Sequence, residues 1–122
     1  MGVTSDDAGS GIHRTPPDGP AIAVPQDALD LIGEAWGVSA STVVVPVERF
    51  DPAFFDLTSG LLGEVTQKFV NYRIRLVVLG DITEHAAASK AFRDYVYEAN
   101  AGDSVWFVTD DAELGLRLAV TA

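Results

Sequence analysis

Three short runs of branched aliphatic and aromatic residues constrain the fold of this chain more than any other feature. Residues 43–45, 76–79 and 105–108 are apolar over their whole length. Strands that are apolar on both faces are typical of a sheet covered on both sides. Between and after these runs, apolar residues recur every three or four positions, which predicts amphipathic helices. Alternating strands and helices predict an α/β fold, with right-handed crossovers wherever the strands are parallel.

The same patterns place the individual elements. The predicted strands cover residues 42–50, 73–80 and 105–108, with short β-type runs at residues 12–14 and 21–24. The predicted helices cover residues 26–36, 60–72, 83–100 and 112–119, and the third is broken near residues 86–89. We therefore expect a flexible tail at residues 1–11 and one α/β domain at residues 12–122. Its centre is predicted to be a mixed sheet of four to five strands with helices packed on it.

The apolar faces of these elements define the expected core. Six residues from the predicted strands and helices are expected to be buried together in one core: Val44, Val65, Phe69, Val77, Phe92 and Val105. A chain of 122 residues has room for one such core and not for two.

The charge balance excludes several classes of partner. The chain has 8 Lys and Arg residues against 18 Asp and Glu residues, a formal net charge of −10. Such a field repels nucleic acid and anionic lipid, so we expect neither as a partner. No apolar run approaches the roughly 20 residues that span a bilayer. Residues 1–10 also lack the basic start and the apolar stretch of a secretory signal, which predicts a cytoplasmic protein.

The residues that commonly hold metals and cofactors are scarce. The chain has no cysteine, and its two histidines, His13 and His85, are far apart in the sequence. A zinc site needs three or four convergent ligands, so we expect no metal. Neither of the familiar glycine-rich phosphate-binding motifs is present, and we expect no cofactor.

The most informative stretch for function lies between a predicted strand and a predicted helix. Asp56, Thr58 and Ser59 can each cap a helix, and Gly60 keeps the first turn of that helix bare. A helix N-terminus with exposed hydroxyls attracts anions or can accept a phosphoryl group. The other interpretation is that these residues only cap the helix.

The helix that follows has a polar stripe at helical spacing. Glu64, Gln67, Lys68 and Asn71 lie on one face, opposite the apolar residues. This stripe is either a solvated face with a weak Glu64–Lys68 pair or a recognition face beside the hydroxyl-bearing loop.

Two further features suggest other surfaces. Gly80 and Asp81 follow a buried strand, where a small molecule could bind in a crevice at the strand ends. Aromatic residues come in close pairs, at residues 54–55, 95–97 and 106–107. Exposed aromatics mark association surfaces, so we expect self-association as a symmetric dimer.

Several motifs together resemble a known family. The residues that carry the resemblance are 26–32 (QDALDLI), 55–64 (FDLTSGLLGE), 67–73 (QKFVNYR), Gly80–Asp81, Arg93–Asp94 and 98–100 (EAN). Over residues 21–118 the chain resembles the bacterial DUF4180 family, which has no assigned activity. The resemblance implies a family name and not a reaction.

A shorter stretch is similar to STAS domains, the anti-sigma-factor antagonist class. Residues 56–61 (DLTSGL) stand where that class has an Asp-Ser-Ser-Gly-Leu-like loop before a helix, with Leu57 inserted and Thr58 in place of serine. This similarity implies a STAS-like architecture. In that class the hydroxyl residue at the helix start can be phosphorylated, which makes Thr58 or Ser59 the candidate for phosphorylation here.

These observations favour a non-enzymatic regulatory module that binds a protein partner. Its predicted working surface is the loop and helix at residues 56–71. The alternative is a small-molecule-binding protein or enzyme that uses a crevice near Gly80 and Asp81.

Overall fold

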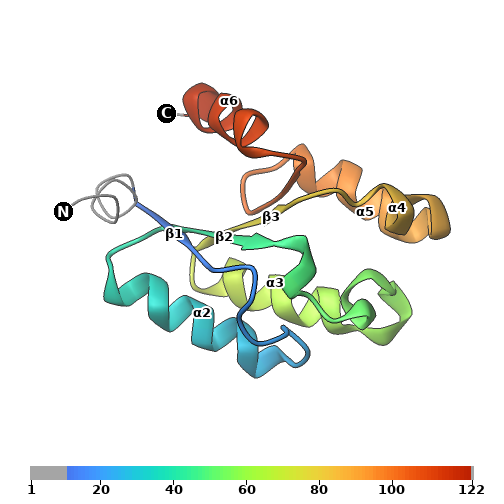
Figure 1. The fold of residues 1–122 in the computed structure, drawn as a ribbon, viewed down its shortest axis with the longest axis horizontal. Helices are drawn as coiled ribbons and strands as arrows, with labels where there is room; N and C mark the ends of the chain where they lie inside the picture. The colour runs from blue at the N-terminus through green and yellow to red at the C-terminus, as the bar shows by residue number, and fades with distance from the viewer. Residues whose placement is uncertain (1–10, 122) are drawn as a thin grey trace.

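Four parallel strands form the centre of the structure, a computed structural model that describes residues 11–121 (Figure 1). In chain order the strands are β1 (Ile12–Arg14), β2 (Thr42–Pro46), β3 (Arg75–Leu79) and β4 (Val105–Val108). The helices are α2 (Pro25–Gly37), α3 (Leu61–Asn71), α4 (Thr83–Ala88), α5 (Lys90–Asn100) and α6 (Asp111–Thr121). Three short 3-10 helices join β2 to α3: η1 (Val47–Arg49), η2 (Pro52–Phe55) and η3 (Leu57–Ser59).

The predicted α/β class, single domain and element order are confirmed, and the differences have local causes. The predicted strand at residues 42–50 ends at Pro46, which has no N–H for the ladder, and the chain turns into η1. The predicted break in the third helix falls at Ser89, whose hydroxyl accepts a hydrogen bond from the Phe92 N–H. The run at residues 21–24 forms one isolated bridge, between Ile22 and Phe50. Apart from Gly11, the tail predicted at residues 1–11 lies outside the described residues.

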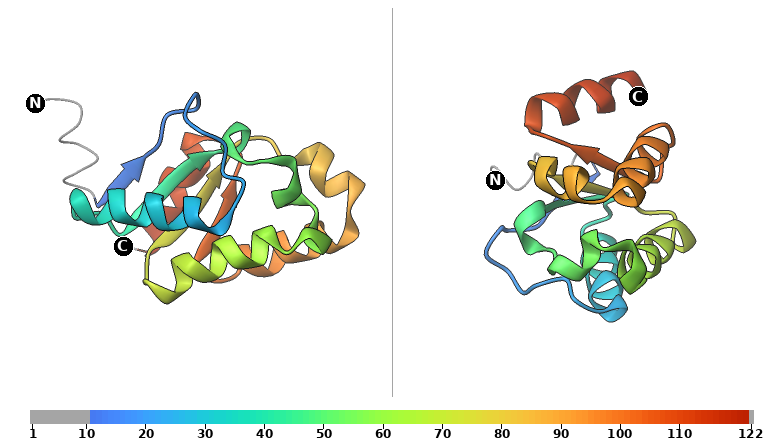
Figure 2. Two further views of the ribbon diagram at one scale, coloured as in Figure 1. Left: turned by 90° about the horizontal axis from the view of Figure 1, so that it is seen from below. Right: turned by 90° about the vertical axis from the view of Figure 1, so that its right-hand side faces the viewer.

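The sheet is entirely parallel, so the prediction of a mixed sheet is wrong. The strand order is β1-β2-β3-β4, and every neighbouring pair runs in the same direction. Each strand is followed by at least one helix that returns the chain to the same end of the sheet. With right-handed crossovers, this order places α2, α3 and α5 on one face. Helix α6 follows the last strand and lies on the opposite face (Figures 1 and 2).

The sheet divides the apolar interior into two clusters. All six residues predicted to form the core are buried, but Val44 and Val77 belong to a second cluster on the α6 side. The single predicted core is therefore wrong, because successive side chains of a strand point to opposite faces. We call the two sides the three-helix face and the α6 face. The strand residues of the three-helix face are Val43, Val45, Leu76, Val78, Val105 and Phe107, and those of the α6 face are Ile12, Val44, Val77, Trp106 and Val108.

A buried arginine holds the proline-rich connection between β1 and α2. The Arg49 guanidinium donates from Nε to the Pro20 carbonyl and from Nη1 to the Pro16 carbonyl, both at 2.8 Å. Gly19 packs so closely that an added Cβ would lie 2.6 Å from the Arg49 Cζ. Proline has no backbone N–H to donate, so a proline-rich segment forms few backbone hydrogen bonds of its own. Here the Arg49 side chain binds two of its carbonyls instead.

The β4 edge of the sheet is covered by one side-chain amide. Asn100 accepts a hydrogen bond from the Phe107 N–H at 2.8 Å and donates to the Phe107 carbonyl at 3.2 Å. The amide therefore pairs with the edge strand as a further strand would. The backbone carbonyl of Asn100 accepts a hydrogen bond from the Arg117 guanidinium of α6.

Helices of the described part of the chain are all too short or too polar to cross a membrane.

Candidate functional site

The predicted hydroxyl-bearing loop forms local hydrogen bonds at the start of α3. One carboxylate oxygen of Asp56 accepts from the Thr58 N–H at 3.1 Å and from the Thr58 hydroxyl at 2.7 Å. The Ser59 hydroxyl donates to the Ala53 carbonyl at 2.6 Å and accepts from the Leu61 N–H at 3.1 Å. Gly60 joins η3 to α3 with a φ of +82°, a conformation that favours glycine. Asp56 thus caps η3, Ser59 binds the first N–H of α3, and Gly60 is the N-cap of α3, whereas Thr58 donates its hydroxyl to Asp56.

Most of the predicted polar stripe of α3 is exposed at the outer edge of the helix. Glu64, Gln67 and Asn71 are exposed, and Lys68 is partly buried. The Gln67 amide donates to the Asn71 side-chain carbonyl at 2.8 Å. Glu64 and Lys68, which both lie in the described part of the chain, do not form the predicted ion pair.

The Gly80–Asp81 turn caps α4. One carboxylate oxygen of Asp81 accepts from the Thr83 N–H at 2.9 Å and from the Thr83 hydroxyl at 2.5 Å. The hydrogen bonds from Thr83 lower the pKa of Asp81. Gly80 has a φ of +142° and lies against Val47, where an added Cβ would approach to 2.8 Å. The predicted site residues thus occupy three places: the start of α3, its outer stripe and the start of α4.

A groove between α3 and α5 adjoins the predicted stripe at Gln67. Its volume is about 460 Å³. It is lined by Gly63, Thr66, Gln67 and Val70 of α3, by Tyr95, Glu98 and Ala99 of α5, and by residues 102–105. Burial raises the pKa of the Tyr95 phenol, and the nearby Thr66 hydroxyl acts in the opposite direction. We call this hollow the α3–α5 groove.

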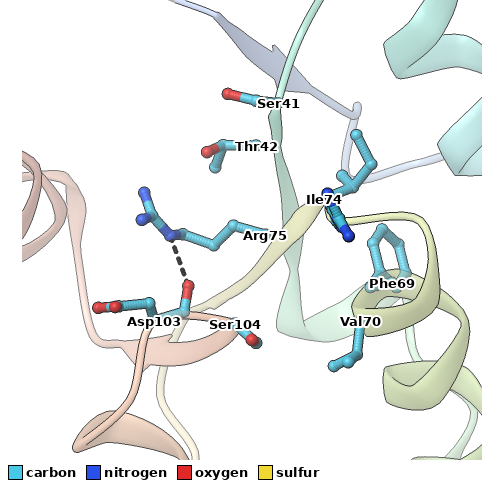
Figure 3. Close-up of a pocket in the computed structure, with 9 residues that line it drawn as sticks. Ser41, Thr42, Phe69, Val70, Ile74, Arg75, Asp103 and Ser104 are labelled. Atoms are coloured by element: carbon cyan, nitrogen blue, oxygen red, sulfur yellow. Dashed lines mark hydrogen bonds between the residues drawn. The ribbon is translucent and has the colours of Figure 1, made fainter.

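A second hollow lies where β2, β3 and β4 begin. Its volume is about 310 Å³. It is lined by Ser41, Thr42, Phe69, Val70, Arg73, Ile74, Arg75, Asp103 and Ser104 (Figure 3). Val70, Asp103 and Ser104 also line the α3–α5 groove, so the two hollows adjoin. We call it the amino-end pocket.

Arg75 is held in place at the amino-end pocket. Its Nε donates to the Asp103 carbonyl at 2.8 Å, and its guanidinium lies 4.1 Å from the centre of the Trp106 ring. Both Nη groups have no hydrogen-bond partner among residues 11–121. Thr42 faces Arg75 in the strand register and is 4 % exposed, and no described residue bonds to its hydroxyl. In Figure 3 the Arg75 guanidinium and the hydroxyls of Ser41 and Thr42 point to the same side.

Arg73 reaches the pocket from a strained turn. The Ile74 N–H bonds to the Phe69 carbonyl at 3.0 Å, which closes α3 with a Schellman-type turn. Such a turn places one residue in the left-handed region, usually Gly or Asn, and here it is Arg73 with a φ of +58°. A left-handed non-glycine residue costs about 1–2 kcal/mol. The Arg73 guanidinium is exposed and forms no hydrogen bond or ion pair within the described chain.

Sequence reasoning missed both arginines. The pocket residues come from three segments separated by about thirty residues each, and each segment lies where the chain enters a strand. The available signal was the Arg-x-Arg spacing directly after the helix predicted at residues 60–72, at a turn where glycine is usual.

Comparisons with known proteins identify the family of the chain. A family model described as a domain of unknown function, DUF4180, matches residues 8–118 and confirms the resemblance expected from the motifs. No curated protein and no solved structure matches the chain. The similarity to STAS domains stays a prediction.

Proposed function

Because the chain belongs to the DUF4180 family, whose description assigns no function, we propose one from the geometry. The protein is a non-enzymatic interaction module that binds a segment of a partner protein in the α3–α5 groove. We call this role regulatory because the protein would act by binding its partner and not by catalysing a reaction.

The observation that carries this proposal is the composition of the groove along one side of α3. Val70, Tyr95 and Val105 provide apolar surface, while Gln67 and Glu98 provide polar groups. Peptide-recognition grooves combine apolar pockets with a small number of polar contacts in this way. The groove also adjoins the stripe that the sequence predicted as a recognition face.

The alternative site near Gly80 and Asp81 has less support. The Asp81 carboxylate already accepts two hydrogen bonds from Thr83. His85, the histidine nearest in sequence, stacks on Phe55 with ring centres 3.7 Å apart, as a packing residue does. A small-molecule site there would have to displace these contacts.

Phosphorylation of Ser59 is the regulatory step that fits this proposal. The hydroxyl now donates to the Ala53 carbonyl, and a phosphoryl group would remove that donor and add negative charge beside Asp56. We expect Ser59→Asp to loosen the turn before α3 more than Ser59→Ala does. If both variants fold and bind selected peptides as the parent does, Ser59 is a cap without a regulatory role.

Self-association stays a proposal. The pairs Phe54–Phe55 and Trp106–Phe107 are buried within the monomer and cannot form an interface. Of the third predicted pair, Tyr97 is exposed. Trp36 and Tyr72, at the ends of α2 and α3, are also exposed and pack edge to face at 5.2 Å. Sedimentation at micromolar concentration tests for a dimer, and a 13 kDa species alone would contradict it.

Two glycine variants test the groove. An added Cβ at Gly63 or at Gly33 meets nothing within 4 Å, so both positions accept a side chain without a clash. Gly63 lines the groove, whereas Gly33 lies on α2 outside it. Peptides are selected from a displayed random library against the parent protein. We expect Gly63→Gln to weaken their binding at least tenfold and Gly33→Gln to leave it unchanged. Equal binding to both variants, or no selected peptide, would contradict the proposal.

A further inference from the structure

We propose that the amino-end pocket binds a carboxylate of the partner segment, and that Arg73 and Arg75 are the residues that bind it. The inference rests on the proposed function for the identity of the occupant. The carboxylate is the C-terminal carboxylate of a segment that lies in the adjoining α3–α5 groove.

The first step is that these two arginines differ from most other cationic residues of the chain. Arg14 and Lys90 form ion pairs with carboxylates. Arg49 and Arg93 donate to backbone carbonyls. The Arg73 guanidinium and both Nη groups of Arg75 have no such partner in the described part of the chain, although acidic residues outnumber basic ones by 18 to 8. A protein this acidic could readily have paired them internally.

The second step is that Arg75 is already ordered for binding. The bond from Nε to the Asp103 carbonyl and the stacking on Trp106 fix the plane of the guanidinium. A planar guanidinium with two free Nη groups matches the geometry of a carboxylate. Because the side chain is fixed before binding, little conformational entropy is lost when a ligand is bound. The Thr42 hydroxyl, on the neighbouring strand, is a further donor beside the same guanidinium.

The third step concerns the backbone of Arg73. The left-handed conformation that closes α3 would cost nothing with glycine, and the chain carries an arginine there instead. Strain of this kind is a basis for a hypothesis of function, because the Arg73 side chain forms no hydrogen bond or ion pair within residues 11–121 that would offset it.

The fourth step selects a carboxylate over a phosphate. Asp103 lines the same pocket, and the whole chain carries a net charge of −10. Repulsion from these charges is greater for a phosphate group, which carries about −1.5 to −2 at neutral pH, than for a carboxylate. Phe69, Val70 and Ile74 line the part of the pocket away from the Arg75 guanidinium (Figure 3), where Val70 also lines the groove, and they offer apolar surface to the body of the segment.

The test uses two probes that differ in one charge, N-acetyl-leucine and N-acetyl-leucine amide. Each is titrated at constant ionic strength into ¹⁵N-labelled protein, and the arginine Nε–H and backbone amide signals are followed. We expect saturable shifts at Arg75 and Asp103 with the acid and none with the amide. Identical shifts with both probes would overturn the inference, and so would tighter binding of inorganic phosphate than of the acid.

Two variants with the same backbone effect separate binding from folding. Arg73→Gly removes the guanidinium and also relieves the left-handed strain, which offsets the greater freedom of the unfolded chain, so we expect the variant to fold as the parent does. Ser39 has the same φ of +58° after α2, and Ser39→Gly relieves that strain outside the pocket. We expect binding of the acid to weaken at least fivefold in Arg73→Gly and to stay unchanged in Ser39→Gly. Parental affinity in Arg73→Gly would overturn the inference.

The outcomes also separate this inference from the proposed function. Selected peptides could lack a carboxylate, bind Gly63→Gln more weakly than the parent and bind Arg73→Gly normally. That result would support binding in the α3–α5 groove and refute the carboxylate site in the amino-end pocket. Binding of N-acetyl-leucine that Arg73→Gly abolishes, without any peptide that binds the groove, would support a carboxylate site and refute the partner segment.

Discussion

The two faces of the sheet are made by the same four strands, yet they are covered in different ways. Three helices pack on the three-helix face, where Phe69 of α3 and Phe92 of α5 are fully buried. A single helix covers the other face, and its buried contribution is Leu114, with Leu118 partly buried beside it. The strand order β1-β2-β3-β4 is the cause, because right-handed crossovers in this order all fall on the same side.

The α6 face compensates with polar contacts around one large ring. Trp106 is 1 % exposed, and its indole N–H donates to the Gly102 carbonyl at 2.8 Å. Arg75 of β3 and Arg117 of α6 lie 4.1 and 4.2 Å from the centre of the ring. Each cation–π contact of this kind contributes about 0.5–2 kcal/mol. The three-helix face therefore contributes most of the stability of the fold, while the packing of the α6 face depends on one helix and one tryptophan.

The largest expected effect comes from the three-helix face. Phe69→Ala should lower the free energy of unfolding by about 3–5 kcal/mol, because it removes a fully buried ring and leaves a cavity. Denaturant unfolding measures the change, with the exposed neighbour Val70→Ala as the control. A loss below about 1 kcal/mol would show that this face does not hold the fold.

A smaller and more local effect is expected on the α6 face. Leu114→Ala should cost about 2–3 kcal/mol, and the cost should fall on the attachment of α6. Native-state hydrogen exchange is the measurement. Amides of α6 should exchange faster, while those of α2 and α3 keep their protection. An equal loss of protection in all three helices would contradict the separation of the two faces.

The β4 edge, where the two faces meet, gives the next effect. Asn100→Asp removes the donor to the Phe107 carbonyl and should cost about 1–2 kcal/mol. Asn71→Asp is the matched control, because the Asn71 side chain is exposed and its bond to Gln67 lies on the surface. Equal unfolding midpoints for the two variants would show that Asn100 does not secure the edge.

The smallest effects sharpen the comparison. Gly33 in α2 and Gly115 in α6 both have open space for a Cβ. Alanine at either position should stabilise its helix by about 0.5–1 kcal/mol. We expect Gly33→Ala to raise the global unfolding midpoint and Gly115→Ala to raise mainly the exchange protection of α6. A global effect of the same size from Gly115→Ala would indicate that α6 unfolds together with the rest.

The sequence contained most of the fold and little of the site. Apolar runs and helical periodicity are local signals, and they placed every strand, every long helix and the break at Ser89. Strand direction and the division of the core depend on which elements lie beside one another, which no local pattern records. Val44 and Val77 looked like the other core residues, because a strand that is apolar on both faces does not show which helices each of its sides packs against.

The candidate site depends even more on which elements lie beside one another. Asp56 and Ser59 were conspicuous because polar residues cluster before α3, and the structure gives each of them a capping contact. Arg75 becomes notable only when Asp103 and Trp106, about thirty residues away in sequence, fix its guanidinium. The left-handed turn at Arg73 is likewise invisible in a sequence that has no glycine at that position.

Each strand pairs with the next one along the chain, and this order affects how the protein folds while it is being synthesised. The N-terminal part of a chain leaves the ribosome first, and domains begin to fold as they emerge. Here β1, β2 and β3 can assemble with α2 and α3 before Trp106 has been made, because none of their pairings waits for a later strand. During that interval Val44 and Val77 face solvent on the side that α6 later covers. We therefore expect nascent chains that end before β4 to be the form of this protein most prone to aggregate and most in need of a chaperone.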